Sequence, residues 1–302
     1  MAAHFAPIAL FVYNRPWHIR QSVEALEKNA LASQSDLIIF SDAPKTVDDA
    51  PTVREVRSYM RSIGGFKSIR IVERESNLGL ANSIIDGVTI VCGEYGRVIV
   101  VEDDLVTSPY FLKYMNDALD TYENDEAVAS IHGYWYLVDQ QMPETFFLRG
   151  ASCWGWATWT RGWQLFEPDG AKLLAELRRQ KLTKLFDLDG AISYTQMLRD
   201  QITGKNNSWA IRWHAATFLA NCLQLSPGMS LVQNIGIDGT GTHTKTVSSV
   251  YDTHLAVTPV VVKHIELVEG REARAALIRY YHSIKRNILV RVLGRLRRMV
   301  GI

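Results

Sequence analysis

Residues 97–105 read Arg97-Val98-Ile99-Val100-Val101-Glu102-Asp103-Asp104-Leu105, so four consecutive β-branched residues are followed at once by three carboxylates. An all-apolar run of this kind is typical of a central strand covered on both faces, as in a parallel sheet. Three adjacent carboxylates repel one another and lose hydration unless a cation binds near them. Ligands of open α/β sheets bind outside the carboxyl ends of the strands. The stretch therefore predicts a strand that brings a hard-metal site to a ligand cleft.

The composition indicates a globular protein without a strong global charge. The chain has 302 residues, of which 47% are hydrophobic and 22% charged, and its net charge of +1 argues against a nucleic-acid partner. Its three cysteines are widely spaced and form no CxxC motif, which favours a reducing cytosol and no zinc site. The apolar run 8–13 is too short for a signal peptide, and no run reaches the roughly 18 apolar residues of a membrane-spanning helix. We therefore expect a cytoplasmic protein.

Strand and helix signals alternate through the first 130 residues. The expected strands cover 8–13, 37–40, 68–73 and the stretch around Val98, and the helices between them cover 17–29, 50–63 and 80–91. This βαβαβαβ order with short connections predicts an α/β fold, a mostly parallel central sheet with helices on both faces. After residue 130 the pattern becomes irregular and rich in aromatic residues, with helical segments near 171–185, 192–203 and 209–221.

The last segment, Arg279 to Ile302, contains seven Arg or Lys and no Asp or Glu, and its apolar residues recur at helical spacing. A basic amphipathic helix of this kind commonly lies on an anionic membrane surface. The alternative is a C-terminal helix that packs on the core and exposes its basic face. The composition favours the membrane, which would place the protein at the inner face of the cell membrane.

The acid motif resembles that of a known family. Val100-Val101-Glu102-Asp103-Asp104-Leu105 is similar to the EDD motif of the N-acetylglucosaminyltransferase I family, and the chain also resembles bacterial family 2-like sugar transferases, some labelled haemolytic-protein-like. The resemblance covers roughly residues 6 to 245. It implies the Rossmann-like GT-A fold, a nucleotide-sugar donor and Mn²⁺ or Mg²⁺. It also implies that Asp104 ligates the metal and that Asp103 lies by the ribose or sugar of the donor.

Other motifs follow in the order that the resemblance implies. Arg15, in Asn14-Arg15-Pro16, would meet the nucleotide, and Asp42 would read the uracil. Asn77 and Asn82 belong to a stretch similar to the NxGxAxAxN loop and helix of family 2. Each motif also has a simpler interpretation, respectively a proline turn, a capping carboxylate and a helix entry. The backbone N–H groups of such a helix entry would also suit an anion.

A glycine-rich loop, 234–243, resembles a segment that folds over the donor diphosphate. Its three glycines allow close approach to a ligand or lid movement. His243 at its end suits a metal or a phosphate, or is structural. Further upstream, Trp154 and Trp156 suit an acceptor platform near the sugar, because aromatic faces pack on sugar C–H groups. A buried aromatic core is the alternative for this tryptophan cluster.

The catalytic base is harder to place. An inverting transferase needs a carboxylate to take the proton of the acceptor hydroxyl. The resembled family holds that Asp in a Trp-Asp-Asp-Trp setting, but the corresponding residues here, Asn206-Asn207-Ser208-Trp209, contain no acid. Asp200, Asp238 and Glu167 are the candidates, and Asp200 is equally well explained as a charge on a helix surface.

Together these features predict a metal-dependent glycosyltransferase, an inverting hexosyl- or N-acetylhexosaminyltransferase. It would move a sugar from a nucleotide-sugar, expected to be a UDP-sugar, to a glycan or lipid-linked glycan in surface polysaccharide synthesis. Residues 1–130 would bind the donor, residues 131–250 of the same domain the acceptor, and residues 251–302 would form the helical extension. One alternative is a non-catalytic, membrane-bound carbohydrate-binding protein with a degenerate donor site. The other is a sugar-phosphate nucleotidyltransferase, which the absence of glycine in Asn14-Arg15-Pro16 disfavours.

Overall fold

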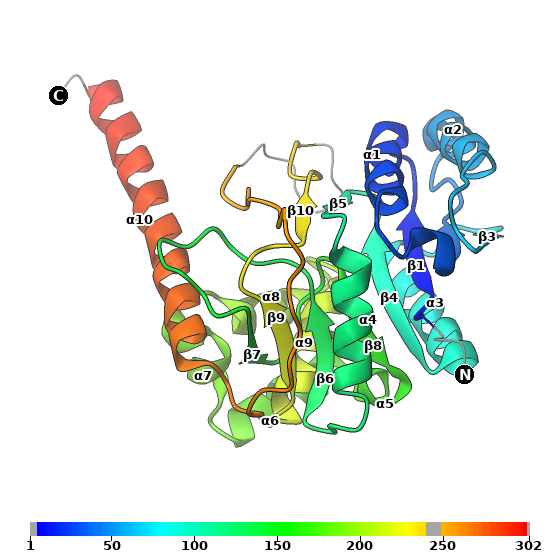
Figure 1. Cartoon of the computed structure of the whole chain (residues 1–302). Helices are drawn as coiled ribbons and strands as arrows, with labels where there is room; N and C mark the ends of the chain where they lie inside the picture. The colour runs from blue at the N-terminus through cyan, green and yellow to red at the C-terminus, as the bar shows by residue number, and fades with distance from the viewer. Residues whose placement is uncertain (1–4, 240–248, 301–302) are drawn as a thin grey trace.

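The fold is an eight-stranded sheet with helices on both faces, as seen in a computed structural model (Figure 1). The structure describes residues 5–239 and 249–300, with only the backbone for 286–300. The strand order is β3-β2-β1-β4-β8-β6-β9-β7, and β5 and β10 form a separate two-stranded ribbon. The strands are β1 (Ile8–Val12), β2 (Asp36–Ser41), β3 (Ser68–Glu73), β4 (Arg97–Glu102), β5 (Leu105–Thr107), β6 (Val128–His132), β7 (Thr145–Arg149), β8 (Trp156–Trp159), β9 (Leu223–Pro227) and β10 (Val232–Asn234).

Most strands run in one direction. β3, β2, β1 and β4 pair in parallel, β8 is antiparallel to both β4 and β6, β9 is parallel to β6, and β7 reverses again at the edge. The register pairs Phe11 with Glu102 and Val12 with Ser41, so the carboxyl ends of β1, β2 and β4 meet at one edge. The predicted mostly parallel α/β sheet is confirmed.

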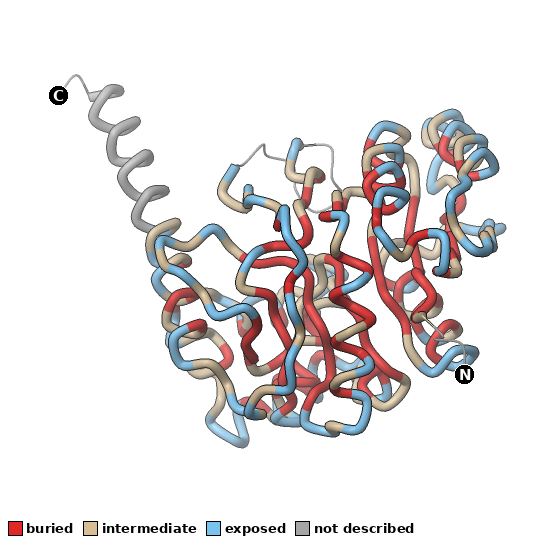
Figure 2. The backbone as a smooth tube through the Cα atoms, in the orientation of Figure 1, coloured by how far each residue is buried: buried red, intermediate tan, exposed pale blue. Residues whose placement is uncertain are grey.

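Alternation along the central strands builds two cores. Successive side chains of a strand point to opposite faces. In β1, Ile8 and Leu10 face one cluster, whereas Ala9 and Phe11 face the other; β4 divides its valines and isoleucine in the same way. All of these residues are almost fully buried, which Figure 2 shows as red strands through the middle of the molecule. Burial on both faces explains why the run before the acids contains only β-branched residues.

Helices α1, α2 and α4 supply residues to the first core, and α3, α5 and α9 contribute to the second. α3 ends at Gly96, which adopts a left-handed conformation with φ of 78° that suits glycine. The helices are α1 (Pro16–Glu27), α2 (Ala50–Met60), α3 (Leu80–Tyr95), α4 (Phe111–Thr121), α5 (Thr160–Trp163), α6 (Gly170–Arg179), α7 (Thr183–Phe186), α8 (Tyr194–Ile202), α9 (Trp209–Leu219) and α10 (Arg271–Val300).

The C-terminal helix α10 begins eight residues before the predicted Arg279, and its first half belongs to the body of the protein. Ala273, Leu277 and Tyr281 are buried against a cluster that includes Trp135 and Phe146. The docked-helix alternative therefore holds for this half, because aromatic side chains from the loop after β6 cover it. Among the described helices, none is long and apolar enough to cross a membrane.

Candidate active site

A cavity opens at the edge where β1, β2 and β4 end. Its volume, measured as the space that the centres of water molecules can occupy, is about 290 Å³. The cavity is lined by the residues that follow these three strands, by Asn77 and Trp154, and by the start of the late glycine-rich loop. The structure thus brings six segments that are separate in the sequence to the position expected for a ligand of an open α/β sheet.

The three acids all line this cavity. Strict alternation along an extended strand would turn the side chain of Asp103 away from those of Glu102 and Asp104. Instead β4 ends at Glu102 and the chain turns at Asp103 and Asp104, which breaks the alternation. Burial, together with Asp104, raises the pKa of Asp103 to about 7, and burial and the two neighbouring acids raise the pKa of Glu102 well above its usual value. This surplus of negative charge is what a bound cation would relieve.

Arg15 lies over the acids. Its Nη1 donates to Asp104 Oδ2 at 2.8 Å and lies 4.0 Å from Asp103 Oδ1. Arg15 directly precedes α1, whose first residue is Pro16, and this rigid start holds the arginine at the mouth of the cavity. The residue predicted to meet the nucleotide is therefore within reach of the acid cluster.

His18 and Asp238 extend this network. His18 Nε2 lies 2.8 Å from Arg15 Nη2 and 3.0 Å from Asp238 Oδ2, and Asp238 Oδ1 lies 3.6 Å from Arg15 Nη2. Burial and the nearby Arg15 lower the pKa of His18, and Asp238 opposes this effect. The sequence analysis missed His18, although its place one helical turn after Arg15 is a usable signal.

The late loop packs directly on the acids. β10 pairs with β5, which follows the acid motif, and Ile235 N donates to Asp104 O at 2.9 Å. A side-chain Cβ at Gly236 would lie 2.0 Å from Asp104 Oδ2 and 2.9 Å from Arg15 Nη1. A side chain at this position would force the loop or the side chains of Asp104 and Arg15 to shift. His243 lies outside the described residues.

Asp42 and Asn77 line the cavity but have structural partners. Both Asp42 oxygens accept backbone N–H groups, from Ala43 and from Leu78 and Gly79 at the start of α3. Asn77 donates to Ala43 O at 2.7 Å. Asp42 Oδ1 accepts two of these bonds and Oδ2 accepts one, so Oδ2 has acceptor capacity left, and a capping role and a base-reading role are compatible. Asn82 is exposed, bonds back to Leu78 O, and does not line the cavity.

The two predicted tryptophans, Trp154 and Trp156, lie in different environments. Trp154 lines the cavity, with its ring edge-on to Tyr134 at 4.9 Å between centroids. The prediction that Trp156 also lies near the sugar needs correction. Trp156 is fully buried on the other side of its strand, where it stacks on Trp209 and contacts Trp163 and Trp213. The buried-core interpretation holds for Trp156, because Gly155 at φ of 61° turns the chain between the two indoles.

The three candidates for the catalytic base lie in different places. Asp238 is the candidate that the structure brings to the acid cluster. Asp200 lies on α8 and contacts Gln196 and Lys205, away from the cavity-lining residues, which matches its interpretation as a surface charge. Glu167 pairs with Lys172 and likewise lies outside the cavity. The segment without an acid contains Ser208, which caps α9.

The acid cluster fits a divalent metal in donor chemistry. Asp103 and Asp104 present hard carboxylate oxygens of the kind that Mn²⁺ and Mg²⁺ prefer, and their mutual repulsion calls for a cation. Within residues 5–239 and 249–285, no group of three or more His, Cys, Asp or Glu side chains, this cluster included, is arranged to hold a metal ion by itself. A metal here would thus need ligands from water and substrate.

The mixed sheet, with acids after β4 and a reversed β8 beside it, has the architecture of the GT-A glycosyltransferases. Residues 8–173, more than half of the chain, match the family described as glycosyl transferase family 2. The chain belongs to this family, and the prediction of a glycosyltransferase is confirmed. The narrower resemblance to the N-acetylglucosaminyltransferase I family is not confirmed.

Several solved structures resemble the chain only distantly. S. aureus TarS 1–349 is 14% identical, with 58% of this chain and 49% of that chain covered and a TM-score of 0.33. PcManGT from Pyrobaculum calidifontis, solved with GDP-Man and Mn²⁺, is 12% identical, with coverages of 44% and 36% and a TM-score of 0.31. Glucosyl-3-phosphoglycerate synthase from Mycobacterium tuberculosis, solved with Mn²⁺, UDP and glucosyl-3-phosphoglycerate, is 11% identical, with coverages of 59% and 67% and a TM-score of 0.34.

The chain spans between 23% and 49% of the length of the first four matched structures. Similarity this low carries no information about substrate. No curated protein sequence matches the chain.

Proposed function

We propose that this protein transfers a sugar from a UDP-sugar to a glycan or lipid-linked glycan, in a reaction that depends on Mn²⁺ or Mg²⁺. The observation that carries the proposal is the convergence of Asp103, Asp104 and Arg15 under the Gly236 loop. An acid pair and an arginine at one cavity match a diphosphate with its metal, since the metal binds both the carboxylate and the phosphates. Asp42 and Asn77, which line the same cavity, would lie by the nucleoside, and we call this cavity the donor cavity.

The residues have distinct roles in this proposal. Asp104 would hold the metal and Asp103 would lie by the ribose or sugar of the donor. When bound, the metal would neutralise charge on the leaving diphosphate as a Lewis acid. Arg15, at hydrogen-bond distance from Asp104, would contribute a fixed positive charge to the same diphosphate. Asp238 is our candidate for the base in an inverting transfer to an acceptor hydroxyl, and a hexosyl or N-acetylhexosaminyl group is the proposed cargo.

The proposed location is the inner face of the cell membrane, in surface polysaccharide synthesis. The sequence from residue 286 onward has five arginines and no acid, while the preceding part of α10 is fixed to the body. A chain truncated after Lys285 should keep its fold, lose binding to anionic liposomes, and retain donor binding. Unchanged liposome binding would refute the membrane contact. The boundaries at residues 130 and 250 remain a proposed division of the chain.

The donor is tested by a thermal-shift screen of nucleotide sugars with Mn²⁺, followed by measurement of nucleoside diphosphate release. A ligand that binds only the folded state raises the unfolding temperature. We expect a UDP-sugar to give the largest shift, and we expect the shift to need metal. An absence of both binding and release with every nucleotide sugar would instead support the carbohydrate-binding alternative.

A further inference from the structure

The imidazole of His18 lies between a cation and a carboxylate that come from different segments of the chain. His18 Nε2 lies 2.8 Å from Arg15 Nη2 and 3.0 Å from Asp238 Oδ2. We propose that His18 is a positioning residue whose Nε2 passes from Arg15 to Asp238 when a diphosphate binds Arg15. The roles given to Arg15 and Asp238 rest on the proposed function, whereas the sharing of Nε2 between them does not.

A single ring nitrogen cannot satisfy both neighbours at once. The guanidinium of Arg15 only donates hydrogen bonds, and the ionised carboxylate of Asp238 only accepts them. Nε2 therefore needs a lone pair to bond to Arg15 and a hydrogen to bond to Asp238. Burial and the nearby Arg15 lower the pKa of His18, so the neutral ring carries one proton, on either Nδ1 or Nε2. In the ligand-free protein the two bonds must alternate.

The surroundings of His18 hold its ring in place. His18 is 6% exposed and lies in the first turn of α1, which starts at Pro16. The ring of Trp17 is edge-on to it, at 4.9 Å between centroids. One turn further along α1, Ser22 Oγ donates to Asp103 O at 2.7 Å and ties the helix to the acid motif. The ring can therefore exchange partners by a change of tautomer alone, in which water takes the proton from Nδ1 and returns one to Nε2.

The two neighbours of His18 belong to different parts of the site. Arg15 also donates from Nη1 to Asp104 Oδ2. Asp238 follows Ile237, which lines the donor cavity, and its side chain is 38% exposed. Arg15 Nη2 lies 3.6 Å from Asp238 Oδ1, so Arg15 and His18 both contact this carboxylate. A diphosphate that draws Arg15 Nη2 away would leave Asp238 to His18, because guanidinium groups form their strongest hydrogen bonds with such anions.

This exchange bears on the candidate base. A carboxylate beside Arg15 accepts a proton less readily, since the cation stabilises its charged form. Donor binding would withdraw the cation from Asp238 Oδ1, while the N–H of His18 would keep Oδ2 in a fixed orientation. The donor would in this way prepare Asp238 before the acceptor hydroxyl arrives.

The proton on His18 can be followed by NMR of the full chain labelled with ¹⁵N-histidine, because the chemical shift of a ring nitrogen separates its protonated from its unprotonated form. Mg²⁺ is the metal of choice, since it is diamagnetic, and the ring is neutral at about pH 8. The variant His18→Gln identifies the His18 signals by their loss. We expect an Nε2 shift between the two extremes in the ligand-free wild type, and a move to the protonated extreme when UDP and Mg²⁺ are added.

Two variants test the sharing without any ligand. Arg15→Met removes the donor, so Nε2 should move to the protonated extreme, as it should with UDP. Asp238→Asn removes the anion, so Nε2 should move to the unprotonated extreme. His264→Asn, at an exposed histidine that contacts Asp125, is the control and should leave both His18 shifts unchanged.

Kinetics separate the positioning of Asp238 from support of the fold. At residue 18, glutamine keeps an N–H near the place of Nε2, whereas leucine fills the space without one. His18→Leu should lower the rate of nucleoside diphosphate release at saturating donor about tenfold, as for one lost hydrogen bond, and should change the KM for the donor less than about threefold. His18→Gln should recover most of the lost rate.

Three results would overturn the proposal. They are an Nε2 shift that stays fixed in Arg15→Met and Asp238→Asn, an unchanged Nε2 shift when UDP binds to the wild type, or equal losses of rate in His18→Gln and His18→Leu. If both variants move Nε2 as expected and the wild type binds no nucleoside diphosphate, the result would count against the proposed function alone.

Discussion

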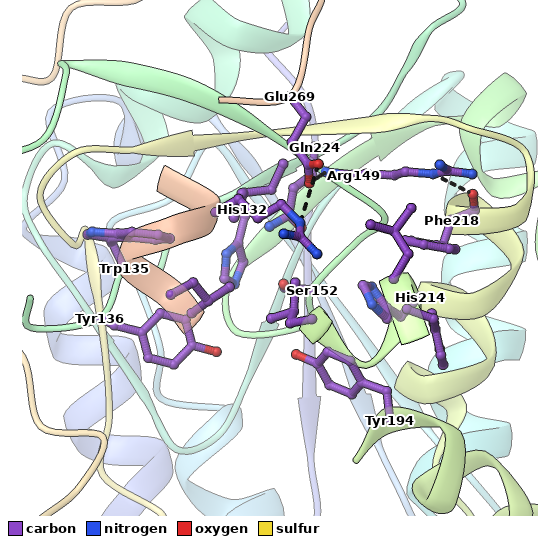
Figure 3. A pocket seen from close by; sticks show the side chains of 16 residues that line it. His132, Trp135, Tyr136, Arg149, Ser152, Tyr194, His214, Phe218, Gln224 and Glu269 are labelled. Atoms are coloured by element: carbon purple, nitrogen blue, oxygen red, sulfur yellow. Dashed lines mark hydrogen bonds and ion pairs between the residues drawn. The ribbon is translucent and has the colours of Figure 1, made fainter. Parts of the chain in front are cut away.

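The cavity beside the three acids and a small buried cavity beside β6 differ in chemistry; the second, which we call the β6 chamber, is lined by His132, Ser152, Tyr194 and Gln224 among others (Figure 3). The donor cavity concentrates three carboxylates whose repulsion is only partly offset by Arg15. The chamber combines buried polar atoms of His132 and Gln224 with aromatic rings and with charged residues, Arg149, Glu269 and Arg274, at its border. An excess of negative charge calls for a cation, whereas buried polar atoms without protein partners call for small hydrogen-bonding groups such as water.

The largest effect that separates the two regions should come from Asp104→Ala. Metal-dependent release of nucleoside diphosphate should fall roughly 10³-fold, because the lost metal contributes several kcal/mol to stabilising the leaving group. Asp200→Ala is the matched control and should stay within about twofold of wild type, since its carboxylate lies outside the cavity. Initial rates at saturating donor measure both. An equal loss in Asp200→Ala would mean that the acid on α8 takes part in the reaction.

Alanine variants of Trp154 and Trp156 distinguish a residue that lines the cavity from a residue of the core. Trp156→Ala should cost about 3–5 kcal/mol of unfolding free energy, because it empties a fully buried aromatic cluster. Trp154→Ala should cost about 1 kcal/mol and should act mainly on ligand affinity, since its half-buried ring lines the cavity. Urea unfolding and donor titration of each variant measure the two effects. Similar losses of stability in both would remove the distinction.

Gly236→Ala should sharpen the link between the late loop and the acids. The added methyl would overlap Asp104 Oδ2, so the loop or the Asp104 carboxylate must shift, at a cost of about 1–3 kcal/mol, and Mn²⁺ should bind more weakly. Gly64→Ala is the control, because a Cβ there meets no atom within 4 Å, and it should change stability by less than about 0.5 kcal/mol. Thermal unfolding with and without Mn²⁺ and UDP compares them. Wild-type metal affinity in Gly236→Ala would show that the loop does not shape the site.

The pH dependence of stability should show the two regions with opposite signs. The folded-state pKa of His132 is about 3, below the ordinary 6.5, so the unfolded chain binds the proton first as the pH falls. Stability contributed by neutral His132 is complete above pH 6.5 and declines by about 1.5 kcal/mol between pH 6.5 and 5. Asp103 has the opposite effect. Its pKa in the metal-free folded state is raised to about 7, so the folded state takes up a proton at a higher pH than the unfolded state does. The contribution of Asp103 to stability therefore increases as the pH falls below 7.

The variant His132→Phe isolates the contribution of His132 to the pH dependence of stability. Urea unfolding of metal-free protein at pH 7 and 5 should show a smaller loss on acidification than in the wild type. The exposed His264, replaced by Asn, serves as the control and should leave the wild-type slope unchanged. A wild-type slope in His132→Phe would mean that the ring is already protonated in the folded state.

Periodicity predicted the N-terminal half of the fold well. The strands β1, β2 and β4 are built on short apolar runs, β3 alternates polar and apolar residues, and the helices between them begin or end near proline or glycine, so local chemistry marks them. The donor cavity followed, because parallel strands put their carboxyl ends at one edge. Arg15, Asp103 and Asp104 could be grouped in this way before any coordinates were known.

The later half depends on contacts that periodicity does not encode. Trp154 and Trp156 have the same residue type and the alternation of a strand, and only the turn at Gly155 sends one to the cavity and the other to the core. The β6 chamber draws His132, Tyr194 and Leu277 from three distant segments, which no local pattern connects. The sequence favoured a membrane-surface helix from Arg279 onward, and the residues that cover the first half of α10, such as Trp135 and Phe146, are too far away in the sequence for a local pattern to reveal this packing.

The contact between Arg15 Nη1 and Asp104 Oδ2, at 2.8 Å, has a thermodynamic consequence. A metal that binds Asp104 must compete with this internal cation, and a diphosphate that attracts Arg15 removes the competitor. Metal and donor should then bind cooperatively, and linkage requires the coupling to be reciprocal: each ligand tightens the other by the same factor. The ion pair would keep the affinity for free metal low, so that the cell's metal pool engages the site chiefly when a nucleotide sugar is present.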